Sequence, residues 1–323
     1  MKTEISKQHT HVVAVQPQTT LPKEDRMKNQ SSTLLKLTAI CMMFVTLTLT
    51  ASASTNGPSG QCLPAPTTTM VAWYPFDEPD GPASSANLAT QNTGTWHGGL
   101  EGSLLGGGYI LQSLWFDGST GYVESPSSIA TNFGPANASP CGGVYSSCSG
   151  DFSTAVWINT STSQYATIFD KRSFDSSGRP HGYLLMLWGN GLLLQLADGG
   201  PAYFGGYNWI QSAPTGVNLA DGHWHFVAVT VSRSPAPGYD VITFYFDYPN
   251  FPSQTQIIAG RERGTLVNTS PLRIGAQNTG SGLGSFFSGS MDELQMWNRV
   301  LTPGATGEVA AIHNAGSYGV CKY

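Results

Sequence analysis

Residues 151–160 read DFSTAVWINT, and this stretch decides the fold of the chain. Its side chains alternate between two sets that are both apolar or β-branched: Phe152, Thr154, Val156 and Ile158 in one, and Ala155 and Trp157 in the other. Successive side chains of a β-strand point to opposite faces of the sheet. The pattern therefore predicts a strand that is covered on both sides.

Further stretches alternate in the same way on either side of this strand. Residues 223–233 (HWHFVAVTVSR) alternate strictly at a period of two, and residues 183–188 and 192–197 flank a glycine-rich turn that predicts a hairpin. Shorter strands are expected at residues 242–247, 272–275 and 290–297, and only residues 307–314 (GEVAAIHN) resemble a helix. Many short strands with one short helix indicate an all-β, two-sheet sandwich in a single domain.

The N-terminal part has a different character. Residues 1–26 are polar and patternless, whereas Met27 is followed by basic residues, the apolar run 37–49 and an A-x-A sequence at 51–53. This order is typical of an export signal peptide, and a run this short disfavours a permanent anchor, which needs ~20 residues. A membrane contact is then expected only transiently, through the signal. The expected organisation is an upstream extension plus signal at 1–53 with the true start at Met27, a Pro/Thr/Ser-rich linker at 54–69, and the sandwich domain at 70–323.

Charge disfavours one class of partner. Charged residues make up 11% of the chain, against roughly 25% in ordinary soluble domains. Residues 1–53 contain six of the 15 Lys and Arg and three of the 20 Asp and Glu, so the remainder carries a formal charge of −8. Such a surface repels phosphate backbones, and we expect no binding to nucleic acid.

Four cysteines remain once Cys41, inside the expected signal, is set aside. An even number in an exported chain predicts two disulfides, with three connectivities open. We favour Cys141–Cys148, which closes a small Gly/Ser loop, together with Cys62–Cys321, which ties the two ends of the domain. The absence of a C-x-x-C pair disfavours a zinc site.

Several strings resemble successive blocks of bacterial secreted laminin-G-like domains, in the order that the family has them. They are MVAWYPFDEPDG (70–81), SLWFDGSTGYVESP (113–126), GDFSTAVWINTSTSQYATIFDKRS (150–173), GYLLML (182–187), LADGHWHFVAVTVSR (219–233), PLRIGAQ (271–277), FFSGSMDELQMWNRVLT (286–302) and EVAAIHNAGSYGVCK (308–322). The resemblance implies a concanavalin A-like, antiparallel jelly roll with one short C-terminal helix. It also implies an exported or cell-surface protein that adheres to glycans or to other proteins.

No catalytic residues are predicted. Laminarinase-type enzymes of this fold share a strand with the motif E-x-D-x-(x)-E, which supplies the carboxylate pair that glycoside hydrolysis needs. This motif is absent from the chain. Asp292 and Glu293 are adjacent, so on a regular strand they point to opposite faces. No G-x-S-x-G nucleophile elbow occurs either.

Calcium is the expected metal, because the resemblance implies a Ca²⁺ held by carboxylates and carbonyls at a sheet edge, and hard oxygen ligands suit that ion. The candidate ligands are Asp292, Asp77 and Asp117. The chain departs from the family at Ala86-Asn87, where relatives commonly have an aspartate. His223 and His225 lie two residues apart on one strand face and could together bind a metal ion. A structural role is favoured for them, because a third and a fourth ligand cannot be named.

A glycine-rich, aromatic segment (ADGGPAYFGGYNWIQ, residues 197–211) is the main candidate for ligand binding. Aromatic rings can stack on sugar rings and amides can bond to hydroxyls. The predicted ligand-binding residues are Tyr203, Tyr207, Asn208 and Trp209, with Trp96 and its neighbour His97 as a second, weaker candidate. The alternative, equally weighted, is that these aromatic side chains close the open end of the sandwich.

Three functions compete at this stage. The leading hypothesis is a secreted, non-catalytic, lectin-like module that binds extracellular carbohydrate. The second is a protein-interaction or adhesion domain without a sugar site, and the third is a glycoside hydrolase with an unrecognised carboxylate pair. Fold alone does not decide between them.

Overall fold

The computed structural model describes residues 62–63, 69–79, 83–103, 106–134, 150–163, 165–189, 191–199, 209–211, 218–236, 239–259 and 266–322. Residues 51–323 form one compact unit. Several predictions lie outside the described residues: the extension and signal at 1–53, the pair Cys141–Cys148, and the candidates Tyr203, Tyr207 and Asn208.

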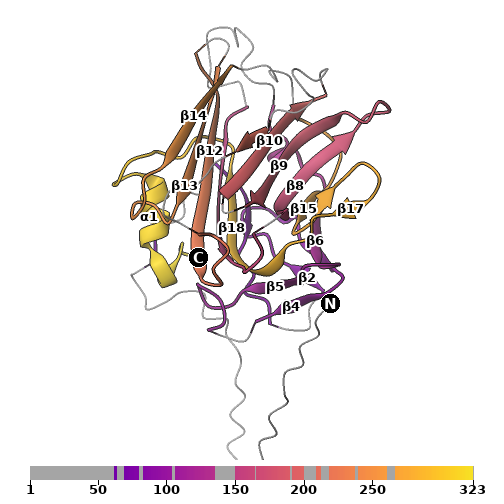
Figure 1. Ribbon diagram of the computed structural model, residues 1–323. Helices are drawn as coiled ribbons and strands as arrows, with labels where there is room; N and C mark the ends of the chain where they lie inside the picture. Colours follow the sequence, from indigo (N-terminus) through magenta and orange to yellow (C-terminus); the bar gives the residue numbers. More distant parts are fainter. Residues whose placement is uncertain are drawn as a thin grey trace, which may run out of the picture. The chain divides into compact units, whose positions relative to one another are not determined.

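Two antiparallel sheets pack face to face, which confirms the predicted jelly-roll sandwich (Figure 1). Sheet I has the order β14 (Gln254–Ala259), β13 (Tyr239–Phe246), β12 (Trp224–Ala236), β7 (Phe152–Asn159), β18 (Ser288–Trp297), β5 (Leu114–Asp117) and β4 (Leu100–Gly102), with β1 (Met70–Tyr74) also paired to β18. Sheet II has the order β11 (Trp209–Gln211), β10 (Gly191–Asp198), β9 (Pro180–Trp188), β8 (Ala166–Phe174), β15 (Leu272–Ile274), β6 (Tyr122–Ser125), β3 (Gly94–His97) and β2 (Ser84–Ser85). A small hairpin joins β16 (Gln277–Asn278) and β17 (Leu283–Gly284).

Strand β7 is buried on both faces, as its sequence predicts. Phe152, Val156 and Ile158 belong to the main core between the sheets, whereas Ala155 and Trp157 belong to a second apolar cluster. This second cluster lies on the outer face of sheet I. The strand therefore contributes to two apolar layers at once.

The C-terminal helix α1 (Glu308–Asn314) covers the outer face of sheet I. Val309 and Ile312 pack into the second cluster, beside Phe226 and Tyr245 of β12 and β13, and Figure 1 shows α1 next to those strands. Short 3₁₀ turns lie at Ile129–Thr131 and Gly316–Tyr318. Among the helices that the structure describes, none has the length and apolar character that crossing a membrane requires.

The two ends of the domain are joined. Cys62 and Cys321 form the predicted disulfide. Leu63 and Val320 form a parallel bridge, supported by hydrogen bonds from Leu63 N–H to Gly319 O (2.9 Å) and from Cys321 N–H to Leu63 O (2.7 Å). Cys62 and Leu63, which the sequence places in a linker, are thus bonded to the C-terminal segment.

Candidate functional site

The outer face of sheet II carries a row of paired residues that crosses the seven strands from β10 to β2. The register places the following positions side by side, from β10 to β2: Gln195, Leu184, Asp170, Arg273, Glu124, Thr95 and Ser84. Directly paired residues point to the same face. The centre of the row therefore brings together two acids and a base from strands far apart in sequence.

The half of this row on β15, β6 and β3 is open to solvent. Tyr122 stacks on His97 with ring centroids 4.6 Å apart and an angle of 12° between the planes, and Phe286 lies 6.5 Å from Tyr122. Glu124 accepts an ion pair from Arg273, at 3.0 Å from Nε to Oε2. We call this surface the Tyr122 patch; it comprises Thr95, His97, Tyr122, Glu124, Arg273 and Phe286, all of which are exposed or half-buried.

The polar groups of the Tyr122 patch are only partly exposed. The Nη1 donor of Arg273 has no hydrogen-bond partner within the described part of the chain, and only 16% of that side chain is exposed. Burial, followed by the charge of Glu124, raises the pKa of Tyr122, so its phenol stays neutral and can donate a hydrogen bond.

The other half of the row is a closed network. Arg172 forms an ion pair with Asp170 (2.8 Å), donates to Gln195 Oε1 and to Asn278 O (2.9 Å), and lies 5.5 Å from the ring centre of Phe174. Burial raises the pKa of Asp170, and its bonds with Arg172 oppose that change. Since Asp170, Arg172 and Gln195 are at most 2% exposed, this network holds the sheet and the β16–β17 hairpin together rather than facing a ligand.

The predicted ligand-binding residues are placed in two different ways. Trp96 points inward: it packs on the main core, and its indole N–H donates to Ser85 Oγ at 2.7 Å. Trp209 begins β11 at the edge of sheet II and is paired with Gln195 in the backbone register, while its side chain lies outside what the structure describes. His97, next to Trp96 in sequence, is the residue of that segment that enters the Tyr122 patch.

Asp117, a predicted calcium ligand, is used within its own turn. Its carboxylate accepts hydrogen bonds from the N–H groups of Ser119, Thr120 and Gly121 at 2.8–2.9 Å and from the hydroxyls of Ser119 and Thr120. These bonds lower the pKa of Asp117 against the opposing effect of burial. They also occupy both carboxylate oxygens. The structure does not bring Asp117 together with the other two candidates.

Asp77 and Asp292, in contrast, meet in one buried acidic cluster with Glu293 and Lys322. Lys322 forms ion pairs with Asp77 and with Glu293 (2.7 Å to Oε1). The expectation that Asp292 and Glu293 point to opposite faces is wrong, because a bulge between Asp292 and Gln295 shifts the register and places Glu293 at φ +54°. Both carboxylates therefore lie on the outer side of sheet I.

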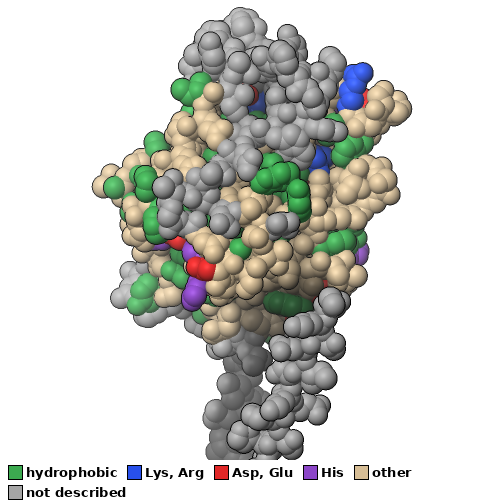
Figure 2. Space-filling model, in the orientation of Figure 1, with side chains coloured by type: hydrophobic (Ala, Val, Ile, Leu, Met, Phe, Trp, Pro, Cys, Tyr) green, Lys and Arg blue, Asp and Glu red, His purple; other side chains and the backbone are tan. Residues whose placement is uncertain are grey.

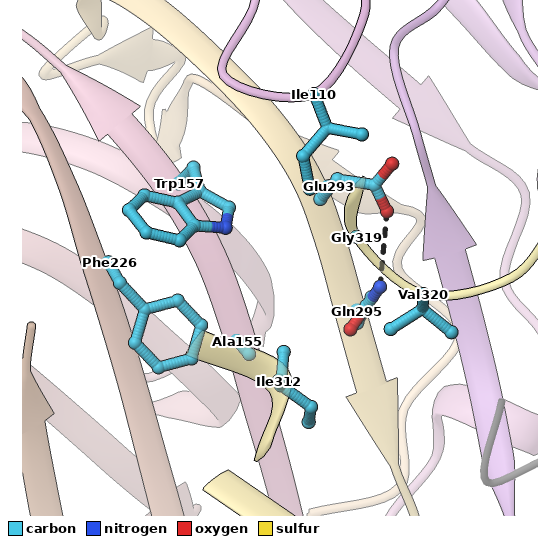
Figure 3. Close-up of a pocket in the computed structure, with 9 residues that line it drawn as sticks. All are labelled: Ile110, Ala155, Trp157, Phe226, Glu293, Gln295, Ile312, Gly319 and Val320. Carbon is cyan, nitrogen blue, oxygen red and sulfur yellow. Dashed lines mark hydrogen bonds between the residues drawn. The ribbon is translucent and has the colours of Figure 1, made fainter. Parts of the chain in front are cut away.

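A small pocket adjoins this cluster (Figure 3). Its walls are mostly apolar and come from β7, β12, α1 and the C-terminal segment. Glu293 and Gln295 supply its polar atoms, and the amide of Gln295 donates to Glu293 Oε2 at 3.1 Å. The pocket separates the acidic cluster from the aromatic side chains of Trp157 and Phe226.

His225 is bonded on both ring nitrogens. Nδ1 lies 2.7 Å from Asp247 Oδ2 and Nε2 lies 3.0 Å from Asp221 Oδ1. These hydrogen bonds, led by that to Asp247, raise the pKa of His225 despite the opposing effect of burial. His225 therefore connects the loop before β12 to the turn after β13, which supports the structural role. Within the described residues no group of three or more His, Cys, Asp or Glu side chains is placed to hold a metal ion.

Sequence reasoning missed most of the Tyr122 patch. The YVES segment at 122–125 carries the alternation that places Tyr122 and Glu124 on one face. The sequence does not indicate which strands pair with this segment, because Arg273, the partner of Glu124, lies about 150 residues further along the chain.

The chain is a β-sandwich of two packed antiparallel sheets. The outer face of sheet II presents polar and aromatic side chains to solvent as a candidate binding surface. Residues 117–305 match the Laminin_G_3 family, described as the concanavalin A-like lectin/glucanases superfamily. The chain belongs to this family. No curated protein matches the chain in sequence.

Solved structures similar to this chain include binding domains of bacterial toxins. The binding domain of Paraclostridial Mosquitocidal Protein 1 is 12% identical over 72% of this chain and 50% of its own, with a TM-score of 0.49. The binding domain of botulinum neurotoxin DC in complex with SialylT is 12% identical over 77% of this chain and 51% of its own, with a TM-score of 0.46. This chain spans about half the length of these proteins, and likeness at that level carries no information on what it binds.

Proposed function

We propose that this chain is an exported, non-catalytic, lectin-like module that binds carbohydrate at the Tyr122 patch. The observation that carries the proposal is the stacked pair His97–Tyr122 beside the Glu124–Arg273 ion pair, on one solvent-facing surface of sheet II. The family's own description, as lectins and glucanases, agrees with a carbohydrate ligand. The Cys62–Cys321 disulfide supports an oxidising, extracellular location.

The chemistry of the patch suits a sugar. A sugar ring has an apolar face that packs on an aromatic ring and hydroxyls at its edge that need hydrogen-bond partners. Tyr122 offers the ring and a phenol hydroxyl, and Glu124 on the same strand face offers an acceptor. Because the acid and the base neutralise each other, the patch favours a neutral sugar over a strongly charged one.

The carboxylates of this face support binding rather than hydrolysis. Hydrolysis of a glycoside by a carboxylate pair requires one acid to hold a proton while the other is ionised. Glu124 is held in an ion pair with Arg273, and Asp170 is wholly buried, out of reach of a polysaccharide, so this face does not present two accessible acids. Release of reducing sugar from polysaccharides by the purified chain would reverse this conclusion.

A glycan array followed by calorimetry tests the proposal. Tyr122→Ala and His97→Ala are expected to weaken binding of the array ligand at least tenfold, equivalent to about 1.4 kcal/mol, with little change in melting temperature. Trp115→Ala is the matched control, because Trp115 is 40% exposed and lies on β5 of sheet I. No glycan binding by the wild-type chain, or equal losses in the control, would refute the proposal.

A protein partner is the second candidate, and an observation on β14 favours it. This strand ends sheet I, and Ile257 on it is 70% exposed. An exposed edge strand with an apolar side chain can pair with an added strand from another protein. Ile257→Lys would then abolish capture of the protein partner while leaving glycan binding at sheet II unchanged.

A further inference from the structure

A second pair of aromatic rings lies on the outer face of sheet II, at Tyr165 and Trp188. The two rings meet edge to face, with centroids 4.6 Å apart and an angle of 77° between the planes. Tyr165 is 50% exposed and Trp188 is half-buried. We call these two residues the Tyr165 pair. Neither of them belongs to the Tyr122 patch.

The packing of Trp188 places the Tyr165 pair on this outer face. Leu185 and Leu187 of β9 belong to the main core, whereas Trp188 packs on a separate apolar cluster that includes Met186. Since alternate residues of a strand point to opposite faces, this separate cluster and Trp188 lie on the face that is turned away from the core. Tyr165 lies there too, because its ring contacts that of Trp188.

The Tyr165 pair and the Tyr122 patch lie toward the same end of the outer face. Along β8 the register runs from Asp170, in the row described above, back to Ala166, which directly follows Tyr165. Along β6 it runs from Glu124, in the same row, back to Tyr122. Both strands pair antiparallel with β15, which lies between them, so they run in the same direction. The two aromatic groups therefore lie on the same side of the row.

The segment that precedes β18 lies between these two groups of rings. Ser285 O accepts the N–H of Thr167, two residues after Tyr165, at 2.9 Å. The next residue, Phe286, is half-buried, and its ring centroid lies 6.5 Å from that of Tyr122. Aromatic side chains therefore occur at intervals across β9, β8, β15 and β6, which are neighbours in this order (Figure 1).

The spacing of the strands sets the length of a ligand that contacts both groups. Neighbouring strands lie about 4.8 Å apart, so β6 and β9, which are three spacings apart, are separated by roughly 14 Å. One sugar ring cannot reach across this distance, whereas a short chain of sugar rings can. Tyr165, Trp188 and Phe286 carry no charge, so the added surface favours a neutral chain, as the Tyr122 patch does.

The backbone of Tyr165 holds its ring in place at a cost. Its φ of +49° lies in the left-handed region, which a bulky residue rarely adopts and glycine adopts freely. Outliers of this kind cluster at binding sites, where the surrounding structure maintains them. The turn itself would be better served by glycine, so its conformation does not explain the presence of a tyrosine.

We propose that the Tyr165 pair is a second subsite of the carbohydrate surface, and that the ligand is a neutral oligosaccharide or polysaccharide chain rather than a single terminal sugar. The chain extends from the Tyr122 patch on β6 toward β9, and the ring of Tyr165 packs on the apolar face of a sugar residue further along it. This inference rests on the proposed function, because the Tyr122 patch supplies the first subsite.

Calorimetric titration with neutral gluco-, manno- and xylo-oligosaccharides of one to six residues, and with fragments of any other glycan that the array identifies, tests the proposal. In the series that binds, affinity is expected to rise about tenfold or more from the disaccharide to the hexasaccharide. Tyr165→Ala is expected to weaken hexasaccharide binding about fivefold or more and to leave disaccharide binding unchanged, whereas Tyr122→Ala weakens both. Tyr318→Ala is the matched control, because Tyr318 is 39% exposed and lies in the 3₁₀ turn after α1.

A second variant separates loss of the ring from damage to the fold. Tyr165→Gly removes the ring but suits the positive φ, so its melting temperature is expected to be no lower than that of the wild type, while hexasaccharide binding falls as in Tyr165→Ala. No binding of any glycan refutes the proposed function and this inference with it. Binding that needs Tyr122 but is equally strong for short and long chains, or that is unchanged in both Tyr165 variants, overturns this inference alone.

Discussion

Removal of the disulfide between Cys62 and Cys321 should destabilise the domain strongly without altering its folded structure. The double variant Cys62→Ser/Cys321→Ser keeps the Leu63–Val320 bridge and its hydrogen bonds. The contacts of the native state are thus nearly unchanged. The effect is expected to come from the unfolded chain, which gains the freedom that the cross-link denies it.

The length of the closed loop sets the magnitude. The two cysteines are 259 residues apart, and the chain-entropy relation assigns about 5–6 kcal/mol at 25 °C to a loop of that length. In a domain of this size, each kcal/mol corresponds to roughly 2–4 °C in melting temperature. The variant should therefore melt roughly 10–24 °C below the oxidised wild type.

Urea denaturation at equilibrium and calorimetry measure the loss, with Cys141→Ser/Cys148→Ser as the comparison. The predicted Cys141–Cys148 pair closes a loop of only about eight residues, worth about 2.5 kcal/mol on the same relation. Glycan binding should survive in both variants. If the long-range pair contributes no more than the short-range one, the stabilisation does not come from loop closure and the reasoning fails.

Three other changes test the packing and the electrostatics. The pKa of His225 is raised by its hydrogen bonds to Asp247 and Asp221. Its contribution to the free energy of unfolding is therefore complete below about pH 6.5, the pKa in the unfolded chain, and is lost as the pH rises through the higher pKa of the folded state. In His225→Gln, the urea midpoint of unfolding should lose this dependence on pH. Leu194→Ala in the core should cost about 2–5 kcal/mol by denaturation, and a loss below 1 kcal/mol would contradict its full burial. Gly182→Ala should destabilise by about 1–3 kcal/mol, because Gly182 has φ +127° and a Cβ there would lie 2.0 Å from Lys171 O; unchanged thermal melting would contradict that contact.

The sandwich could be predicted because the alternation of apolar and polar side chains along each strand indicates which of its faces are buried. Strand β7 is apolar in both registers, and the structure buries it between the main core and the cluster under α1. The hairpin of β9 and β10 could be predicted for the same reason, because alternate residues of each strand face the core and the outer side of the sheet. Side-chain period is a local property, so one sequence suffices to read it.

The bulge in β18 could not be predicted in this way. A period of two assigns Asp292 and Glu293 to opposite faces, and one extra residue reverses that assignment. A glycine often marks a backbone with positive φ, but here the residue at φ +54° is Glu293 itself. The polar partners of its carboxylate, Trp73, Gln295 and Lys322, hold Glu293 in that conformation.

The candidate site was hidden for a related reason. Tyr122 and Glu124 are visible as outward residues of one strand, but their meaning depends on His97 and Arg273 from strands β3 and β15. The order of strands in sheet II is not sequential, so no local pattern brings these positions together. The aromatic segment 197–211 drew attention because its residues are adjacent in sequence, whereas the Tyr122 patch is adjacent only in space.

The distribution of charge ties these findings together. Charged side chains are sparse in this chain, and Figure 2 shows few of them on the described part of the face that it draws. Several charged side chains are buried in ion pairs, as in Asp170–Arg172 and Glu293–Lys322. The ion pair in the Tyr122 patch cancels its own charge. Long-range electrostatic attraction therefore contributes little to recognition at this surface, and affinity has to come from ring stacking and hydrogen bonds. Binding at the patch should accordingly be nearly independent of salt, and a steep salt dependence would exclude the neutral sugar that the geometry favours.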